Sequence, residues 1–139
     1  MHTPIAYPLT IYYDASCPLC RTEMHSLKQA DTAHQLILVD CSPVEMQVPD
    51  SCPVTREALM DRIHAQDAEG RWISGVEVFA AAYTVTGFSK LGKFWSSPTL
   101  RPFLQRAYPW VAKHRFWLSK TPLPWLMQQL LAKKSSKRR

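Results

Sequence analysis

A pair of cysteines at the junction between a strand-like run and a helix-like run constrains this chain more than any other feature. Residues Leu9–Tyr13 are apolar, β-branched or aromatic, which is typical of a buried strand. From Cys17 onward the apolar residues recur at helical spacing, and Pro18 suits the first turn of a helix, where its missing N–H is no loss. A second apolar run, Leu36–Asp40, predicts another strand. A strand, helix and strand of these lengths imply a right-handed parallel crossover.

The middle of the chain predicts a short helix, a hairpin and a further helix. Residues Thr55–Ile63 fit a helix, although Met60–Gln66 also fits a strand that leads into a turn at Gly70. Residues Arg71–Ser74 then return as the hairpin partner. An apolar stripe between Gly75 and Gly87 predicts the next helix. The predicted order is therefore β-α-β-α-β-β-α, an α/β arrangement.

Beyond residue 90 the sequence predicts helices that are punctuated by proline. Ser97 and Pro98 are typical of a helix cap and first turn. Tyr108 and Pro109 restart the helix through about Leu118, and Pro124 begins another that runs to about Ala132. We expect residues 1–90 to form the core and residues 91–132 to form a helical C-terminal extension packed on that core. Residues 133–139 contain five Lys and Arg residues and predict a disordered basic tail.

Length and composition favour one compact domain. The chain has 139 residues, of which 46% are hydrophobic, so it has enough apolar side chains for a core. No apolar run approaches the roughly 18 residues needed to cross a bilayer. The start of the sequence lacks the basic and apolar segments of a secretory leader. We therefore expect a cytoplasmic protein.

The four cysteines predict redox or metal chemistry rather than a framework of structural disulfides. They are Cys17, Cys20, Cys41 and Cys52, and no secretory segment accompanies them. Cys41 follows a buried strand, where it is expected to pack, and Cys52 falls in a loop as an incidental thiol. The Cys-x-x-Cys pair is the candidate catalytic site, because this spacing after a strand and before a helix is typical of redox proteins.

The predicted position of Cys17 favours a thiolate. A helix N-terminus offers unpaired N–H groups and about half a positive charge, and the pKa of a cysteine there falls from about 8.5 to roughly 3.5–7.5. Cys17 would attack a disulfide, and Cys20, one turn further along, would resolve the mixed disulfide. Pro18 keeps the turn rigid. No cofactor beyond the cysteine pair is expected.

Asp14, Ala15 and Ser16 supply the turn between the strand and the helix. Asp14 braces this turn through an Asx hydrogen bond in one interpretation, and exchanges a proton with Cys20 as a general base in the other. An ionised Asp14 beside the thiolate would also raise the pKa of Cys17. Bracing is the favoured role because Asp is common in turns for that reason.

Two other classes of function remain open. A zinc protein would need Cys41 and Cys52 as further ligands, but Cys-x2-Cys-x20-Cys-x10-Cys lacks a second close pair and the five histidines have no metal-like spacing, so no metal is expected. A binding module is suggested by charge, because residues 78–139 contain twelve basic and no acidic residues. That half would contact nucleic acid or an anionic membrane surface, or would pack on the acidic half of its own chain. Of these external partners, nucleic acid is the less favoured.

The segment Tyr12–Arg21 resembles the DCC family of thiol-disulfide oxidoreductases, whose signature is Asp-Gly-x-Cys-x-x-Cys. The resemblance extends over about residues 8–120 and includes the second strand, the hairpin and a later helix, at Leu36–Asp40, Glu69–Trp72, Gly75, Tyr108, Ala112 and Arg115. It implies a thioredoxin-like fold and dithiol–disulfide exchange, with Asp14, Cys17 and Cys20 as the signature residues. It also implies a protein or small-molecule thiol or disulfide as the substrate.

Two features depart from the expected pattern. Ala15 stands where the family usually has glycine, so the turn is strained if it requires a positive φ. Thioredoxins also place a cis-proline opposite the active cysteine, before a strand. Here no proline immediately precedes Met60–Gln66, and the nearest is Pro53. This difference predicts that substrate docking departs from that of thioredoxin.

Overall fold

A computed structural model describes residues 4–138, with side chains described as far as Leu131. Its four-stranded sheet contains β1 (Leu9–Tyr13), β2 (Leu36–Asp40), β3 (His64–Gln66) and β4 (Trp72–Ser74), in the spatial order β2-β1-β3-β4. The pairing of β1 with β2 is parallel, as predicted, and β3 pairs antiparallel with both β1 and β4. The sheet is therefore mixed, with β1 in its interior.

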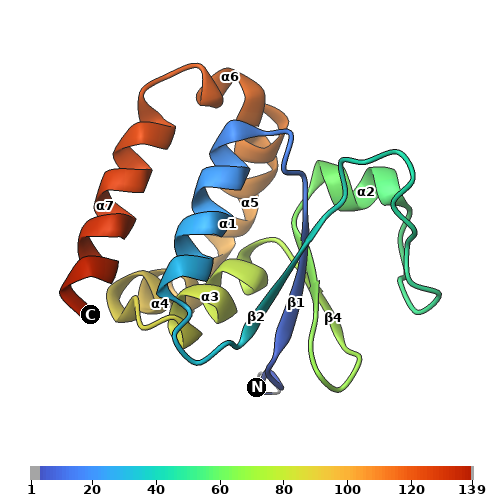
Figure 1. Ribbon diagram of the computed structural model, residues 1–139, viewed down its shortest axis with the longest axis horizontal. Helices are drawn as coiled ribbons and strands as arrows, with labels where there is room; N and C mark the ends of the chain where they lie inside the picture. The colour runs from blue at the N-terminus through green and yellow to red at the C-terminus, as the bar shows by residue number, and fades with distance from the viewer. Residues whose placement is uncertain (1–3, 139) are drawn as a thin grey trace.

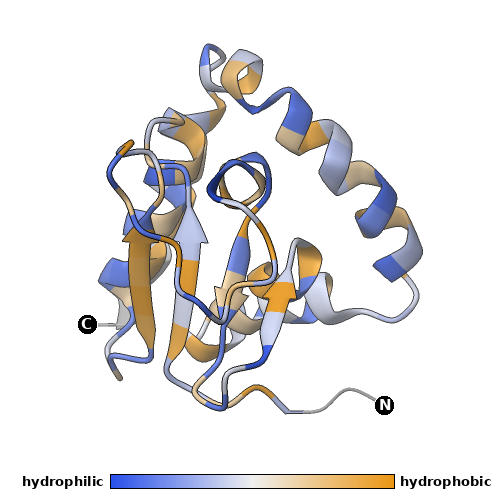
Figure 2. Ribbon diagram, turned by 90° about the vertical axis from the view of Figure 1, so that its right-hand side faces the viewer, coloured by the Kyte–Doolittle hydropathy of each residue, from blue (hydrophilic) through white to orange (hydrophobic). Residues whose placement is uncertain are grey.

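The central strand β1 is apolar because it is covered on both faces. Leu9, Ile11 and Tyr13 join the main core cluster between the sheet and the helices, whereas Tyr12 joins a smaller cluster with Leu59 on the opposite face. Figure 2 shows the hydrophobic residues of the parallel strands in orange. Burial of both faces explains why this strand is nearly continuous in apolar residues.

Seven helices complete the fold of residues 4–138. Most of them lie on one side of the sheet and α2 lies on the other, as Figure 1 shows. They are α1 (Pro18–Ala30), α2 (Arg56–Asp61), α3 (Val76–Val85), α4 (Ser89–Ser96), α5 (Arg101–Lys113), α6 (Arg115–Ser119) and α7 (Leu123–Arg138). No helix of the described part of the chain is long and apolar enough to cross a membrane.

Both interpretations of the segment around residue 60 are partly correct. The helix predicted over Thr55–Ile63 exists as α2 but ends at Asp61, and the strand predicted over Met60–Gln66 exists as β3 but begins at His64. Arg62 has extended backbone angles of φ −141° and ψ 148°, which ends the helix. The hairpin to β4 and the following helix α3 are confirmed. Gly75, which precedes α3, has φ 62°, a conformation that favours glycine.

Two of the helix starts predicted from prolines in the C-terminal region differ from those in the structure. The predicted helix start at Pro98 is wrong because α5 begins at Arg101, and the predicted restart at Pro109 is wrong because that proline lies inside α5. The chain breaks instead at His114, between α5 and α6. Pro109 lacks the N–H that would bond to the fourth residue before it, so α5 continues through this position with one backbone hydrogen bond fewer.

The division of the chain at residue 90 falls inside α4 and stays a prediction. α7 lies beside α1 in Figure 1, and Leu131 of α7 belongs to the main core cluster. The backbone of α7 continues as a helix through Arg138, whereas Arg139 and the side chains from residue 132 onward lie outside the described residues. The expected disorder of residues 133–139 stays a prediction.

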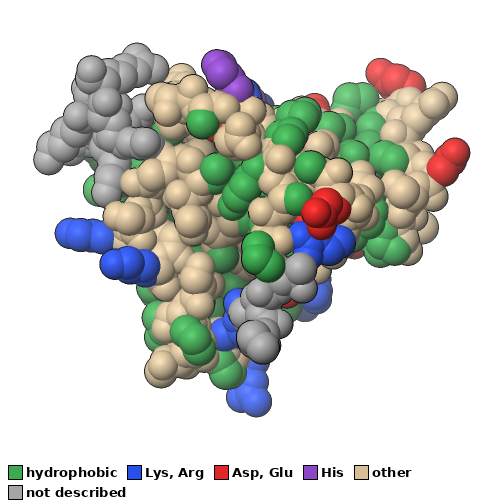
Figure 3. Space-filling model, turned by 90° about the horizontal axis from the view of Figure 1, so that it is seen from below, with side chains coloured by type: hydrophobic (Ala, Val, Ile, Leu, Met, Phe, Trp, Pro, Cys, Tyr) green, Lys and Arg blue, Asp and Glu red, His purple; other side chains and the backbone are tan. Residues whose placement is uncertain are grey.

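Lys and Arg side chains project separately at the left and lower edges of the molecule seen from below, whereas Asp and Glu side chains lie mainly toward the right and the centre (Figure 3).

Candidate active site

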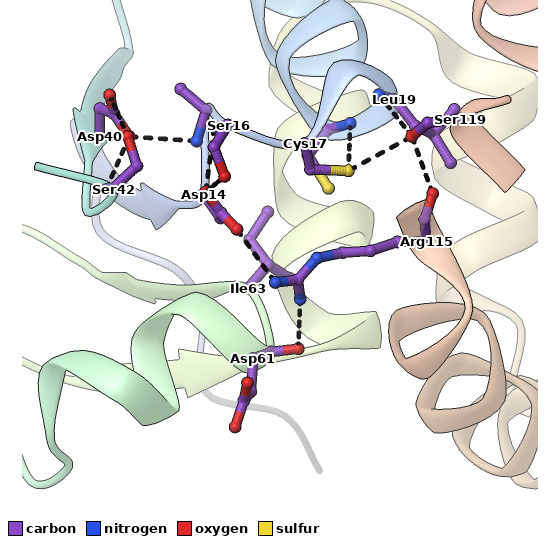
Figure 4. Close-up of polar contacts among 12 residues, drawn as sticks. Asp14, Ser16, Cys17, Leu19, Asp40, Ser42, Asp61, Ile63, Arg115 and Ser119 are labelled. Carbon is purple, nitrogen blue, oxygen red and sulfur yellow. Dashed lines mark hydrogen bonds and ion pairs between the residues drawn. The ribbon is translucent and has the colours of Figure 1, made fainter. Parts of the chain in front are cut away.

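The two cysteines of the Cys-x-x-Cys pair meet at the N-terminus of α1. Cys17 is the N-cap residue, with φ −83° and ψ 115°, and Pro18 is the first residue of the helix. The Cys17 Sγ accepts a hydrogen bond from the backbone N–H of Cys20 at 3.4 Å. The predicted capping position of Cys17 is thus present in the structure (Figure 4).

The proton of the pair resides on Cys20. The pKa of Cys17 is lowered to about 6, chiefly by a hydrogen bond from the Cys20 side chain. The backbone N–H of Cys20, the Ser119 hydroxyl and the charge of Arg115 also lower this pKa, whereas burial opposes them. The same Cys17 contact, together with burial, raises the pKa of Cys20 far above that of an ordinary thiol. At neutral pH the site therefore contains a Cys17 thiolate and a Cys20 thiol.

Helix α6 closes the site over Cys17. The Ser119 hydroxyl oxygen lies 3.7 Å from the Cys17 Sγ, accepts from the Leu19 N–H at 3.2 Å and donates to the Arg115 carbonyl at 2.7 Å. Since a hydroxyl has one hydrogen, Ser119 must turn away from that carbonyl to donate to a Cys17 thiolate. Cys17 has an exposed fraction of 0%, and Cys20 is partly exposed. The thiolate is therefore preformed but covered.

Asp14 has the contacts of a turn brace. Its carboxylate accepts from the backbone N–H of Ser16 at 3.0 Å and from the Ser16 hydroxyl, and its other oxygen accepts from Arg115 at 3.0 Å. The Cys17 N–H donates to the Asp14 carbonyl at 3.3 Å. All the hydrogen bonds described for this carboxylate go to Ser16 or Arg115, which makes the favoured bracing role the better supported of the two.

Arg115 joins three segments that are distant in sequence. Its guanidinium forms the ion pair with Asp14 in the turn before α1, and it donates to the Asp61 carbonyl at the end of α2 at 2.9 Å. Its Nε is buried and has no hydrogen-bond partner among the described residues. The family resemblance singled out Arg115, but nothing in the sequence indicated Ser119, which lies 102 positions from Cys17.

The alanine at position 15 does not strain the turn. His34 is the non-glycine residue with positive φ in the described range, so Ala15 keeps an ordinary conformation. The Ala15 N–H donates to the Asp40 side chain at 3.1 Å, and Asp40 in turn accepts from Ser42. The strain that the missing glycine would have caused is therefore absent.

A side chain of α5 forms a hydrogen bond with the backbone N–H of the residue that precedes β3. The Ile63 N–H donates to the Tyr108 hydroxyl at 2.9 Å. Burial raises the pKa of Tyr108 to about 12, so its hydroxyl stays neutral. An N–H that is already bonded to Tyr108 is not free to pair with an extended substrate at this end of β3.

The other two cysteines lie apart from the pair. Cys41 is buried with Tyr12 and Leu59 under α2, where burial and the charge of Asp40 raise its pKa to about 11. The Cys52 Sγ donates to the Val54 carbonyl at 3.3 Å. Among the described residues, no group of three or more His, Cys, Asp or Glu side chains is arranged as a metal site, so the zinc alternative lacks geometric support.

A cavity of about 70 Å³ lies beside Cys20. Its lining is mostly apolar, but it also includes the side chains of Asp14, Cys20, Glu23, Tyr108 and Arg115. Glu23 of α1 is turned toward this cavity, whose wall also includes Phe79 of α3 and Val111 of α5.

A mixed α/β fold with a helix-capping Cys-x-x-Cys and a low-pKa first cysteine defines a thioredoxin-like thiol–disulfide protein. The chain belongs to the DCC1-like thiol-disulfide oxidoreductase family, which it matches over residues 11–121. It is 30% identical over 100 residues to an uncharacterized chloroplastic protein of Arabidopsis thaliana, an alignment that covers 65% of this chain and 47% of the plant protein. The chain therefore matches about half of that relative's length. No solved structure matches the chain significantly.

Proposed function

We propose that the protein exchanges thiols and disulfides through Cys17 and Cys20, with no other cofactor. The observation that carries this proposal is the geometry of the pair, since Cys17 caps α1 and its Sγ accepts a hydrogen bond from the Cys20 N–H at 3.4 Å. These contacts lower the pKa of Cys17 and raise that of Cys20. A thiolate is the attacking species in disulfide exchange, and a protonated neighbour within hydrogen-bond reach is placed to become the second nucleophile. Family membership supports thiols or disulfides as the substrates.

The reaction transfers two electrons in two substitutions. The Cys17 thiolate attacks one sulfur of a substrate disulfide, forms a mixed disulfide and releases the first substrate thiolate. Cys20 then loses its proton and attacks the Cys17 sulfur, which releases the second thiolate and leaves a Cys17–Cys20 disulfide. The substrate is reduced by two electrons and the protein is oxidised by two. With a dithiol substrate the two steps run in reverse, and the Cys17–Cys20 disulfide is reduced to the two thiols.

Attack by Cys17 requires a movement of α6, because the thiolate is covered in the structure described. The contacts that hold this five-residue helix over the site are those of Ser119 with Leu19 and Cys17 and those of Arg115 with Asp14 and Asp61. Short elements held by a few polar contacts open at low free-energy cost compared with a core. We therefore include a local opening of α6 as the step that precedes attack.

The proposed function is tested by alkylation of the four thiols with iodoacetamide between pH 5 and 9, followed by peptide mass spectrometry. Cys17 should react with an apparent pKa near 6 and faster than Cys41 and Cys52 below pH 7. Mild oxidation should link Cys17 to Cys20. Equal reactivity of all four thiols, or an oxidised protein without that disulfide, would overturn the proposal.

A second candidate function is contact with an anionic membrane surface, favoured by the outer face of α5. Phe103, Arg106, Trp110 and Lys113 follow helical spacing and are all exposed, with exposed fractions of 70% for Phe103 and 55% for Trp110. Residues 78–139 contain no acidic residue that would repel an anionic lipid. Aromatic and basic side chains that alternate on one helix face are typical of segments that lie on a membrane.

A further inference from the structure

Glu23 is a carboxylic acid that the proposed exchange reaction has not yet used. It lies three residues after Cys20 on α1, so both side chains project from the same face of that helix, and both line the cavity. The Tyr83 hydroxyl of α3 donates to the Glu23 Oε1 at 2.8 Å. No Lys, Arg or His forms an ion pair with Glu23 in the described part of the chain. A carboxyl group in such apolar surroundings is a candidate functional group.

The surroundings of Glu23 bring its pKa close to neutral pH, so that the carboxyl group can both accept and release a proton there. Burial and the charge of the Cys17 thiolate raise the pKa of Glu23 to about 7, although the Tyr83 hydrogen bond opposes the change. The titratable and charged side chains that face the same space come from β1, α1, α2, α3, α5 and α6: Tyr13, Asp14, Cys17, Cys20, Asp61, Arg62, Tyr83, Tyr108 and Arg115. Asp61 and Arg62 are exposed at the rim.

The second step of the exchange is faster if a base lies close to Cys20. Cys20 retains its proton while Cys17 is the nucleophile, and it has to lose that proton as it attacks the mixed disulfide. Asp14 is already paired with Arg115 and bonded to Ser16. Of the carboxylates on the cavity wall, Glu23 is the one that is neither exposed nor paired with a cation.

We propose that Glu23 accepts the Cys20 proton, relayed by water in the cavity, as Cys20 attacks the mixed disulfide, and that it returns the proton in the reverse reaction. This inference rests on the proposed function. The cavity of about 70 Å³ exceeds the roughly 10–15 Å³ that one water needs, and the carboxylate and thiol supply polar partners. The S–S bond forms as the S–H bond breaks, the proton moves to the carboxylate, and it is then lost to solvent.

The test separates the two steps with 5,5′-dithiobis(2-nitrobenzoic acid), which releases one coloured thiolate when Cys17 attacks and a second when Cys20 resolves. In Glu23→Gln, which preserves side-chain size and an acceptor for Tyr83, the first phase should stay within about twofold of the parent rate. The second phase should slow at least tenfold at pH 7 and lose its dependence on the ionisation of Glu23, whose pKa is lower in the mixed disulfide than in the reduced protein because the Cys17 thiolate charge is gone.

The direction of the change distinguishes proton transfer from a purely electrostatic or structural role. The negative charge of Glu23 raises the pKa of Cys20. If Glu23 acted only through this charge, its removal in Glu23→Gln would make Cys20 easier to deprotonate and the second phase faster. Glu77→Gln, at an exposed position on α3, is the matched control and should change neither phase.

The outcomes also separate this inference from the function on which it depends. An unchanged or faster second phase in Glu23→Gln, with a normal first phase, would overturn the role of Glu23 alone. Absence of both phases in the parent protein would overturn the exchange function itself. Cys20→Ser should show the first phase only, which confirms the assignment of the phases.

Discussion

The chemistry of the pair depends, at the scale of single residues, on which sulfur holds the shared proton. The largest contribution to the low pKa of Cys17 is the hydrogen bond from the Cys20 side chain. The helix N-terminus adds a backbone N–H from the same residue. Cys20 is therefore both the resolving thiol and the main stabiliser of the first nucleophile.

Replacement of Cys20 by alanine tests this double role. Without the S–H donor, the pKa of Cys17 should rise toward the ordinary thiol value of about 8.5, so its alkylation rate at pH 6 should fall at least about tenfold. Peptide-resolved alkylation from pH 5 to 10 measures both values. Cys52→Ala is the control and should leave the profile of Cys17 unchanged. A Cys17 profile in Cys20→Ala that still titrates near pH 6 would contradict this account.

Glu23 should also make stability depend on pH. Its folded-state pKa of about 7 is above the ordinary value of 4.5, so ionisation favours the unfolded chain and stability falls as pH rises from about 4.5 through 7. Glu23→Gln should be nearly as stable as the parent at pH 5 and more stable by about 1–3 kcal/mol at pH 8. Urea unfolding at the two pH values measures the difference. Equal stability of the two proteins at pH 8 would show that the carboxyl ionises freely.

At the scale of elements, α6 acts as a cover on the N-terminus of α1. Arg115 and Ser119 lie at opposite ends of this short helix and contact the turn before α1 and the first turn of α1, respectively (Figure 4). The cover and the thiolate therefore belong to different parts of the chain, joined by side-chain contacts.

Removal of the Arg115 side chain should expose Cys17. In Arg115→Ala, the rate of Cys17 alkylation at pH 9 should increase about fivefold or more, because the contacts with Asp14 and Asp61 that hold α6 are lost. Measurement at pH 9 isolates access, since Cys17 is a thiolate there even after loss of the positive charge. Arg106→Ala, on the exposed face of α5, should leave the rate unchanged. A rate that does not increase would mean that α6 is not the barrier.

The whole molecule combines an acidic N-terminal part that contains the cysteine pair with a basic C-terminal part that covers it. The stripe Phe103, Arg106, Trp110 and Lys113 lies on α5, which continues through His114 into the covering helix α6. The surface proposed for anionic lipids and the cover of Cys17 are therefore neighbours in the chain.

Binding to lipid vesicles tests whether the stripe on α5 contacts an anionic membrane surface. The protein should sediment with phosphatidylglycerol-containing vesicles, not with pure phosphatidylcholine, and salt should weaken the binding. The double variant Phe103→Ala, Trp110→Ala should bind at least tenfold more weakly, whereas Val44→Ala, a highly exposed position in the loop before α2, should bind normally. No sedimentation at low salt, or stronger binding to single-stranded DNA than to vesicles, would overturn the membrane proposal.

Much of the cysteine site follows from local sequence. The apolar run Leu9–Tyr13, the turn at Asp14 and the proline after Cys17 together predict the strand, the turn and the helix cap that the structure contains. These features depend on residues within one or two turns of each other, so backbone propensity and hydrogen bonding between neighbours are enough to specify them. The parallel partner strand follows for the same reason, because its apolar run is equally local.

Only the tertiary structure shows that Cys17 is covered, that Ser119 touches it, and that Glu23 faces the cavity rather than solvent. These arrangements depend on how helices from the C-terminal part pack against α1, and the contacts join residues about 60 to 102 positions apart. No local pattern encodes such contacts, since they arise from the fit of side chains across the assembled core. The sequence by itself thus determined where the thiolate forms, and the packing of distant helices decided how it is reached.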